Sequence, residues 1–500
     1  MTATGEDSRS TATSPGSGPA GIPFFDRPLT SLHLVLASTG LLLGLGLVMV
    51  LSASMVESFR ERGSAYAVFA NQATFVLLGL PAFWLGVRLS PRCYRRLAYP
   101  ALLVSLALLV AVLLPGVGSS YRGAQRWLDL GPVQMQPAEV AKLALALWGA
   151  DLLVRKQRLL GQARHLVMPL VPVAALMAAL VVLEPDLGTS LCFAMVLFGL
   201  LWTVGAPARI FGALLVVALS AVAALAVAKP YRLARVMHFL DPGADPTGAG
   251  YQPLLGLDSL ASGGWFGVGL GQGRAKWVGL PEGHTDYIFA VIGEELGLVG
   301  GLVVLMLYAT LAYTGLRVAR RTADAFARLA ASGVTVWIVG QALVNMGYVS
   351  GLLPVTGVPL PLISAGGTSL LVTLVALGML ASFARHEPAA AAQLARRGRV
   401  ARLLWLPAPR AAGSRPAGRR GGASRPARAA SPAAGRGGSA GRGGDRSGDR
   451  VAGTAPSAAR SAARGTGRQP RRHQPHQPRP VRSTVSSPAR TPASREARRR

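Results

Sequence analysis

Long apolar runs constrain this chain more than any other feature. A helix rises about 1.5 Å per residue, so roughly 20 apolar residues cross the hydrocarbon core of a bilayer. An unpaired peptide group in hydrocarbon costs several kcal/mol, so such runs must be helical. The expected spans are residues 32–53, 66–87, 97–116, 138–154, 166–183, 187–204, 210–228, 287–315, 329–348 and 358–384. The sequence therefore predicts an all-α polytopic membrane protein with about ten transmembrane helices.

Composition divides the chain into three parts. Only 15% of the residues are charged, against about a quarter in soluble domains. Most of the formal net charge of +30 comes from an Arg, Ala, Gly and Pro-rich tail, residues 386–500, which cannot bury a core and is expected to be disordered. Residues 1–30 are also polar and expected to be disordered, which leaves 31–385 as the membrane domain. Because the high charge belongs to the tail, it does not indicate nucleic-acid binding by the folded part.

The predicted loops differ sharply in positive charge, which indicates the orientation. One set holds Arg88, Arg92, Arg95, Arg96, Arg155, Lys156, Arg158, Arg164, Arg209, Arg317, Arg320, Arg321 and Arg328. The opposite set holds Arg60, Arg62, Arg122 and Arg126, with none in 184–186 or 349–357. The first set is predicted to be cytoplasmic, so both termini are cytoplasmic and the large loop 229–286 lies outside.

Ionisable residues inside a predicted span are candidates for function, because each costs about 2.5–3.5 kcal/mol at the bilayer centre. Glu139 and Lys142 are three residues apart, so they share a helix face and can pair. Such a pair either locks helices together or forms the wall of a polar cavity, and the spacing leaves both open. Arg126 lies just outside this span, at headgroup depth, where an Arg can hold a phosphate through two hydrogen bonds.

Two further acidic groups lie at predicted outer boundaries. Glu184 and Asp186 flank Pro185 between two spans, either as an ordinary solvated turn or as part of a site. Asp286 lies where the large outer loop enters a span, shortly after Glu282 and His284. Asp286 can act as a helix cap or as a general base, and the two roles are compatible.

Two glycine-containing segments interrupt the helical pattern. In residues 345–370, Pro354, Pro359 and Pro361 break the last span, and broken helices at membrane depth persist where they line protein or a water-filled cavity. The run GGWFGVGLGQG, residues 263–273, is not a phosphate-binding loop, because no GK[ST] follows it. We expect it to be a flexible loop.

Several motifs occur together in one order: GAQRWL, MQPAEVAKLA, EPDLGTSL, PEGHTDYIFAVIGEELG and NMGYVSGLLPVTGVPLPLISAGG. In this the chain resembles the SEDS family (shape, elongation, division and sporulation) over residues 30–385. His284 resembles the cell-division branch, FtsW, more than the elongation branch, RodA. The chain departs from the family pattern at Ala138, where Ser is usual, and at Ala365 and Thr368, where an aromatic residue and Ser are usual. None of these departures alters an ionisable residue.

The resemblance implies a peptidoglycan glycosyltransferase that polymerises lipid II, a disaccharide-pentapeptide on undecaprenyl pyrophosphate, at the outer face of the cytoplasmic membrane. It implies a place at the division septum, a class B penicillin-binding protein transpeptidase as partner, and contacts with other division proteins and membrane lipids. No nucleic acid is implied. The family's essential loop aspartate corresponds to Asp286. A divalent metal, magnesium or manganese, is an open alternative as cofactor.

The reaction is compatible with these residues. Asp286 would remove a proton from the acceptor sugar in a single inverting displacement, and cations would stabilise the pyrophosphate that leaves. The candidate substrate-binding residues are Arg126, Glu139, Lys142, Asp186, Lys276, Glu282 and His284. Three alternatives remain at this point: a lipid II flippase, a RodA-like elongation polymerase, and a scaffold that recruits division proteins through the tail.

Overall fold

The computed structural model describes residues 27–396, apart from 122–123, 130, 132–133, 229–238, 240, 242–247 and 249. Most of the two expected disordered ends, residues 1–26 and 397–500, therefore lies outside the described residues. So does most of the first third of the large outer loop. All of the expected transmembrane spans lie within the described residues.

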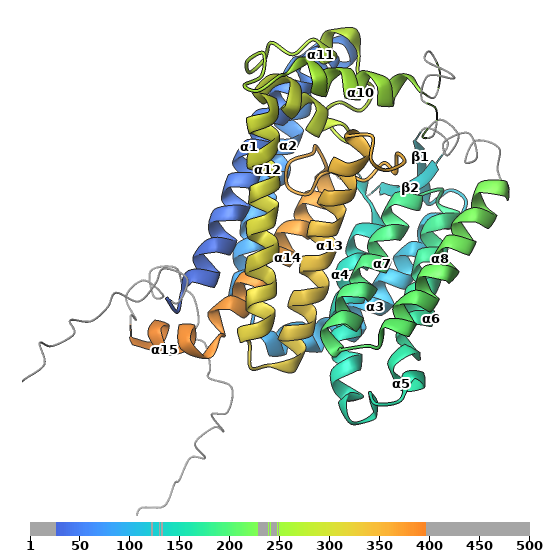
Figure 1. The fold of residues 1–500 in the computed structure, drawn as a ribbon, viewed down its shortest axis with the longest axis vertical. Helices are drawn as coiled ribbons and strands as arrows, with labels where there is room; N and C mark the ends of the chain where they lie inside the picture. The colour runs from blue at the N-terminus through green and yellow to red at the C-terminus, as the bar shows by residue number, and fades with distance from the viewer. Residues whose placement is uncertain are drawn as a thin grey trace, which may run out of the picture. The chain divides into compact units, whose positions relative to one another are not determined.

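The described chain is a helical bundle, and each expected span overlaps a helix (Figure 1). The helices are α1 Thr30–Arg62, α2 Ala67–Arg88, α3 Pro91–Leu113, α4 Pro137–Arg155, α5 Ala163–Val167 with α6 Leu170–Leu183, α7 Leu187–Val204, α8 Ala208–Ala228, α12 Ile288–Arg321, α13 Ala325–Val349 and α14 Gly367–Arg385. Eight spans in the described residues are long and apolar enough to cross a membrane. Helix α4 falls outside that set because it carries four ionisable residues, and α8 because its apolar part is short.

Small residues bring α2 and α14 into close contact. A Cβ atom on Gly86 would lie 3.2 Å from the backbone of Gly378, so the two helices approach each other more closely than larger residues allow. The contacts run in the same order along both helices, from Phe75 against Gly367 to Leu89, whose carbonyl accepts a hydrogen bond from Ser382. Helices α2 and α14 are therefore parallel, and their C-terminal ends lie on the same side of the membrane domain.

Helix α4 lies inside the bundle and carries several of its ionisable residues. It packs against α3, α7 and α13, and its side chains are buried along nearly its whole length. Glu139, Lys142 and Asp151 therefore face protein rather than lipid, as the cost of an exposed charge in hydrocarbon requires, while Arg155 is exposed at the end of the helix.

The outer connections contain structure that the sequence analysis missed. Strands β1 Gly118–Tyr121, β2 Ala124–Asp129 and β3 Gln134–Met135 form an antiparallel sheet in the order β1-β2-β3, in which Gly118 pairs with Leu128 and Asp129 with Gln134. The large loop contains helices α10 Tyr251–Ser262 and α11 Ala275–Val278, which lie at the top of Figure 1. Two short elements, η2 Gln157–Leu159 and α15 Pro388–Arg396, complete the described chain. The sheet carries Arg126 and leads directly into α4.

Two local expectations were wrong. The last span begins at Gly367 rather than 358, because the proline-containing segment before it is not helical. The glycine-rich segment 263–273 is fastened to α12: the amides of Val268 and Gly269 donate to the carbonyls of Glu294 and Glu295 at 3.0 and 3.1 Å. Several of its backbone polar groups have partners, so it is a docked loop rather than a flexible one.

Candidate active site

Asp286 is held in place through its backbone. Its carbonyl oxygen accepts hydrogen bonds from Asn345 Nδ2 at 2.8 Å and from the Tyr348 hydroxyl at 2.9 Å, both on α13. The Asn345 amide also donates to the carbonyl of Val358 at 2.8 Å, and the single Tyr348 hydroxyl proton is shared between the two carbonyls, with the Val358 oxygen at 2.9 Å. One pair of side chains therefore joins Asp286 to the non-helical segment 350–366.

The non-helical segment 350–366 is also bonded to the two residues before Asp286. Ser364 Oγ donates to the carbonyl of Thr285 at 2.6 Å, and the Ala365 amide donates to the carbonyl of His284 at 3.0 Å. Gln72 of α2 then holds this segment from the other side, since it donates to the Ser364 carbonyl at 3.4 Å and accepts from the Gly366 amide at 3.2 Å. The loop that carries Asp286 is thus held by α13 directly and by α2 through the segment 350–366.

The surroundings of the Asp286 carboxyl raise its pKa toward neutral pH. Burial raises its pKa to about 7, and the negative charges of Glu282 and Asp186 act in the same direction. The positive charges of Arg126 and His284 oppose this rise. The structure therefore brings four other predicted site residues close enough for their charges to act on the Asp286 carboxyl. A carboxyl with a pKa near 7 accepts a proton more readily than an ordinary aspartate does.

Glu282 and His284 are each oriented by a neighbour. The Thr285 hydroxyl donates to Glu282 Oε2 at 2.7 Å, while Glu282 itself has a left-handed backbone, with φ of 56°. His284 Nδ1 lies 2.9 Å from Glu57 Oε2 of α1. The turn before Asp286 therefore presents an acid and an imidazole in fixed positions.

Arg126 of β2 fastens the sheet to the turn between α6 and α7. Its side chain donates to the carbonyls of Pro185, at 2.7 Å, and Glu184, at 3.2 Å, and its guanidinium lies 3.8 Å from Asp186 Oδ2. Asp186 in turn accepts from Gln136 Nε2 at 3.1 Å and caps the start of α7. The Arg126 side chain remains 33% exposed. It is therefore anchored and still open to an anion from outside.

Glu184 is a residue for which the sequence analysis left two alternatives open, a solvated turn or part of a site. It is fully buried, and within the described part of the chain neither of its carboxyl oxygens has a hydrogen-bond partner. Burial raises its pKa to about 8, the charge of Asp186 adds to the rise, and Arg126 opposes it. A solvated outer turn is therefore the wrong description, and the carboxyl is mostly protonated at neutral pH. An acid between two uninterrupted apolar runs was the available signal.

Glu139 and Lys142 form the predicted pair. Lys142 Nζ donates to Glu139 Oε1 at 2.8 Å and to Gln341 Oε1 at 3.2 Å, and lies 5.0 Å from the centre of the Trp337 ring. Gln341 then donates to the carbonyl of Pro359 at 2.9 Å. The pair is buried and connects α4 through α13 to the non-helical segment under Asp286. Its position fits a supporting role, and a role in binding substrate stays a prediction.

Lys276 belongs to a different group of polar residues. Its Nζ lies 3.0 Å from Glu295 Oε1, and Glu295 also accepts from Ser52 Oγ of α1 and from the Gly271 amide. The Lys276 side chain is only 5% exposed. This group ties the outer loop to α12 and α1. The structure thus gives Lys276 a buried anionic partner, and its predicted contact with substrate stays a prediction.

Metal ligands do not gather in this region. Among the residues that the structure describes, no group of three or more His, Cys, Asp or Glu side chains is arranged to hold a metal ion. A divalent metal as cofactor therefore stays a prediction.

Known proteins resemble this chain over nearly all of its membrane domain. Residues 32–389 match the FtsW/RodA/SpoVE family, described as cell cycle proteins. A probable peptidoglycan glycosyltransferase FtsW of Mycobacterium tuberculosis is 46% identical over 403 residues, covering 80% of this chain and 77% of the relative. The protein of the same description from Legionella pneumophila is 38% identical over 350 residues, covering 69% and 89%.

Solved structures have the same fold. One, described as "Structural coordination of polymerization and crosslinking by a peptidoglycan synthase complex", has a TM-score of 0.60 and 32% identity, covering 71% of this chain and 97% of that one. The rod shape determining protein RodA of Thermus thermophilus has a TM-score of 0.53 and 31% identity, covering 71% and 96%. The family expected from the motifs is confirmed: this chain belongs to the FtsW/RodA/SpoVE family of cell cycle proteins.

Proposed function

We propose that this chain is a peptidoglycan glycosyltransferase that polymerises lipid II during cell division, with Asp286 as its general base. The names of its relatives supply the activity and the division role. The assignment of the base rests on Asp286, whose backbone carbonyl is held by α13 and whose carboxyl has a pKa of about 7 and feels the charges of Arg126 and Asp186.

The chemistry is one inverting displacement. The C4 hydroxyl of the acceptor sugar gives its proton to the Asp286 carboxylate while its oxygen bonds to the anomeric carbon of the donor. The bond from that carbon to the pyrophosphate breaks at the same time, and the lipid pyrophosphate leaves with the electron pair. A single positioned base contributes a factor of roughly 10²–10⁴ to the rate. Pyrophosphate is a good leaving group, so no covalent sugar–enzyme intermediate is needed.

Arg126 is the cation best placed for the pyrophosphate that leaves. Lys142 is enclosed and paired with Glu139, and Lys276 is enclosed and paired with Glu295. Arg126 keeps a third of its side chain exposed while its hydrogen bonds to two carbonyls hold it in place. A fixed guanidinium stabilises growing negative charge without having to reorganise during the reaction.

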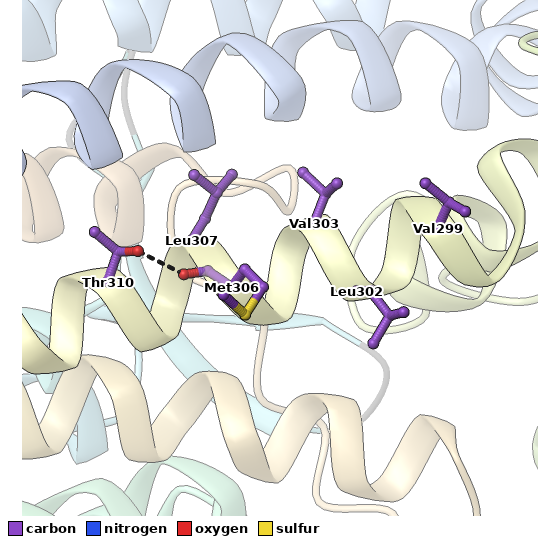
Figure 2. A pocket seen from close by; sticks show the side chains of 6 residues that line it. All are labelled: Val299, Leu302, Val303, Met306, Leu307 and Thr310. Carbon is purple, nitrogen blue, oxygen red and sulfur yellow. Dashed lines mark hydrogen bonds between the residues drawn. The ribbon is translucent and has the colours of Figure 1, made fainter.

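The lipid tail of the substrate has a candidate place on α12. An apolar hollow of about 300 Å³ lies on this helix, and Figure 2 shows the side chains that line it. Its lining residues are Val299, Leu302, Val303, Met306, Leu307 and Thr310. The only hydroxyl among them, on Thr310, donates to the Met306 carbonyl at 2.8 Å. The hollow therefore presents an apolar surface to a prenyl chain, on the helix that begins beside Asp286.

The proposed orientation places Asp286 outside and both termini in the cytoplasm, at the division septum. The excess of Arg and Lys in one set of loops supports this orientation. A class B penicillin-binding protein would cross-link the strands that this chain makes, and one similar structure is described as a peptidoglycan synthase complex.

The decisive experiment uses the full-length chain, purified in detergent, with labelled lipid II and with or without its cognate transpeptidase. Glycan strands are expected from the wild-type chain and not from Asp286→Ala, which should keep the same elution profile in size-exclusion chromatography. Detergent offers no bilayer to cross, so strand formation cannot arise from transport. If no strands form even with the transpeptidase present, the polymerase assignment is wrong and the flippase alternative gains support.

A further inference from the structure

Four arginines line a pocket at the junction of α3 and α4, which we call the arginine pocket. Its volume is about 510 Å³, and its lining residues are Arg92, Arg95, Arg96 and Arg155. The first three lie in the opening turns of α3 and the fourth ends α4, and these two helices pack against each other. The pocket therefore depends on tertiary packing and is more than a run of charge in sequence.

A buried carboxylate orients two of these arginines. Asp151 is completely buried and accepts from Arg95 Nε at 2.5 Å and from Arg155 Nε at 2.6 Å. Arg92 and Arg96 are exposed and have no carboxylate partner within the described residues. One carboxylate thus faces four guanidiniums, and the pocket keeps a strong positive charge. Arginines fixed in this way suit a phosphate, which accepts paired hydrogen bonds from a guanidinium.

The surroundings of the arginine pocket indicate a membrane interface. The Arg155 guanidinium lies 5.1 Å from the centre of the Tyr99 ring, and Tyr99 is 38% exposed. Trp84 at the end of α2 is equally exposed. Trp and Tyr gather at headgroup level in membrane proteins. Further along α3, Leu97 and Leu103 are 45% and 65% exposed, so apolar surface continues from the pocket toward the hydrocarbon.

The arginine pocket lies at the opposite end of the bundle from Asp286. Helix α14 begins next to the segment that contacts the Asp286 loop, and it runs parallel to α2. The end of α2, at Arg88, is therefore far from Asp286, and α3 with its arginines begins there. Helix α4 likewise begins near Asp186 and ends at Arg155. The pocket is therefore separate from the proposed catalytic site and faces the other leaflet.

We propose that the arginine pocket binds the phosphate headgroup of an anionic phospholipid, whose acyl chains lie along the exposed apolar face of α3. Basic pockets between membrane helices bind such headgroups. An anionic phospholipid and free phosphate both offer phosphate oxygens that the guanidiniums can bind. The apolar surface beyond the pocket favours a lipid over free phosphate, because only a lipid has acyl chains that can cover that surface.

The test is native mass spectrometry of the full-length protein in detergent, titrated with phosphatidylglycerol, cardiolipin or phosphatidylcholine. The variant is the double substitution Arg92→Gln with Arg96→Gln, which breaks no ion pair with Asp151. The matched control is Arg158→Gln with Arg164→Gln, which removes the same charge from exposed residues of the adjacent loop, outside the pocket. Occupancy by anionic lipid is expected to fall roughly tenfold in the first variant, and little in the control.

Three results would overturn the proposal. Equal losses in both double variants would mean that anionic lipid responds to the general charge of this face. No loss in either would mean that the pocket holds no lipid. Displacement of the lipid by inorganic phosphate at equal concentration would make free phosphate the ligand. Should the double variant misfold, each single substitution is expected to lower occupancy severalfold, and unchanged occupancy in both would refute the site.

Discussion

The side-chain amide of Asn345 donates a 2.8 Å hydrogen bond to the backbone carbonyl of Asp286. It donates at the same time to the carbonyl of Val358, and the Tyr348 hydroxyl shares its proton between the same two carbonyls. The proposed base is thus positioned by two residues 59 and 62 positions further along the chain. Its placement therefore depends on α13.

Tyr348→Phe should slow lipid II polymerisation about tenfold with little change in KM. The substitution removes a hydroxyl whose shared hydrogen bond is worth about 1 kcal/mol, and the ring still packs against Tyr287. The base would then be correctly charged but less well placed. Initial rates at several lipid II concentrations measure this, with Tyr66→Phe, on an exposed tyrosine, as control. An unchanged rate would show that the hydroxyl does not position the base.

The second prediction concerns the pH profile. Asp286 acts as a base only when ionised, and its pKa is about 7, so kcat/KM should rise with pH and level off above neutrality. Glu282 raises this pKa and Arg126 lowers it. Glu282→Gln should therefore move the rise to lower pH, and Arg126→Gln should move it to higher pH. Initial rates between pH 5 and 9, in steps of about half a unit, measure both. Shifts in the same direction would contradict the assignment.

The third prediction concerns Glu184, whose pKa in the folded chain is about 8 against 4.5 for an ordinary glutamate. A carboxyl with a raised pKa favours the folded state below pH 4.5, and this contribution declines as pH rises to 8. Glu184→Gln replaces it with a neutral side chain of similar size. The variant should therefore resemble the wild type in thermal stability at low pH and exceed it above pH 8. Melting of the detergent-solubilised proteins tests this, and a constant difference at all pH values would disprove it.

The sequence predicted those features that depend on local spacing. Apolar runs of about 20 residues located the helices, and a separation of three residues predicted the Glu139–Lys142 pair. Asp286 was recognisable because it occupies a boundary position inside a motif. Contacts between distant residues could not be predicted in this way. The bonds from Asn345 to Asp286 and from Val268 to Glu294 connect segments whose proximity arises only after the helices pack.

The same limit explains the missed strands and the misjudged loop. Strands β1 and β2 are short and lie between two spans, where no alternating apolar pattern marks them. The glycine-rich segment looked flexible because its composition is typical of mobile linkers. Its glycines instead permit two backbones to approach each other closely. The sequence shows that the segment is rich in glycine, but not that another backbone packs against it.

The last prediction concerns Gly297, where α12 departs from helical geometry. Its φ is +69°, and a Cβ atom there would lie 2.3 Å from the amide nitrogen of Gly267. Gly297→Ala should therefore lower stability, by roughly 1–3 kcal/mol for the strained backbone alone, and loosen the docked loop. Gly301→Ala is the matched control, since a Cβ atom there meets only the Phe289 ring at 3.6 Å. Thermal melting and proteolysis within residues 263–273 measure the two effects. If both alanine variants melt alike and resist protease equally, close backbone contact at Gly297 does not hold the loop on α12.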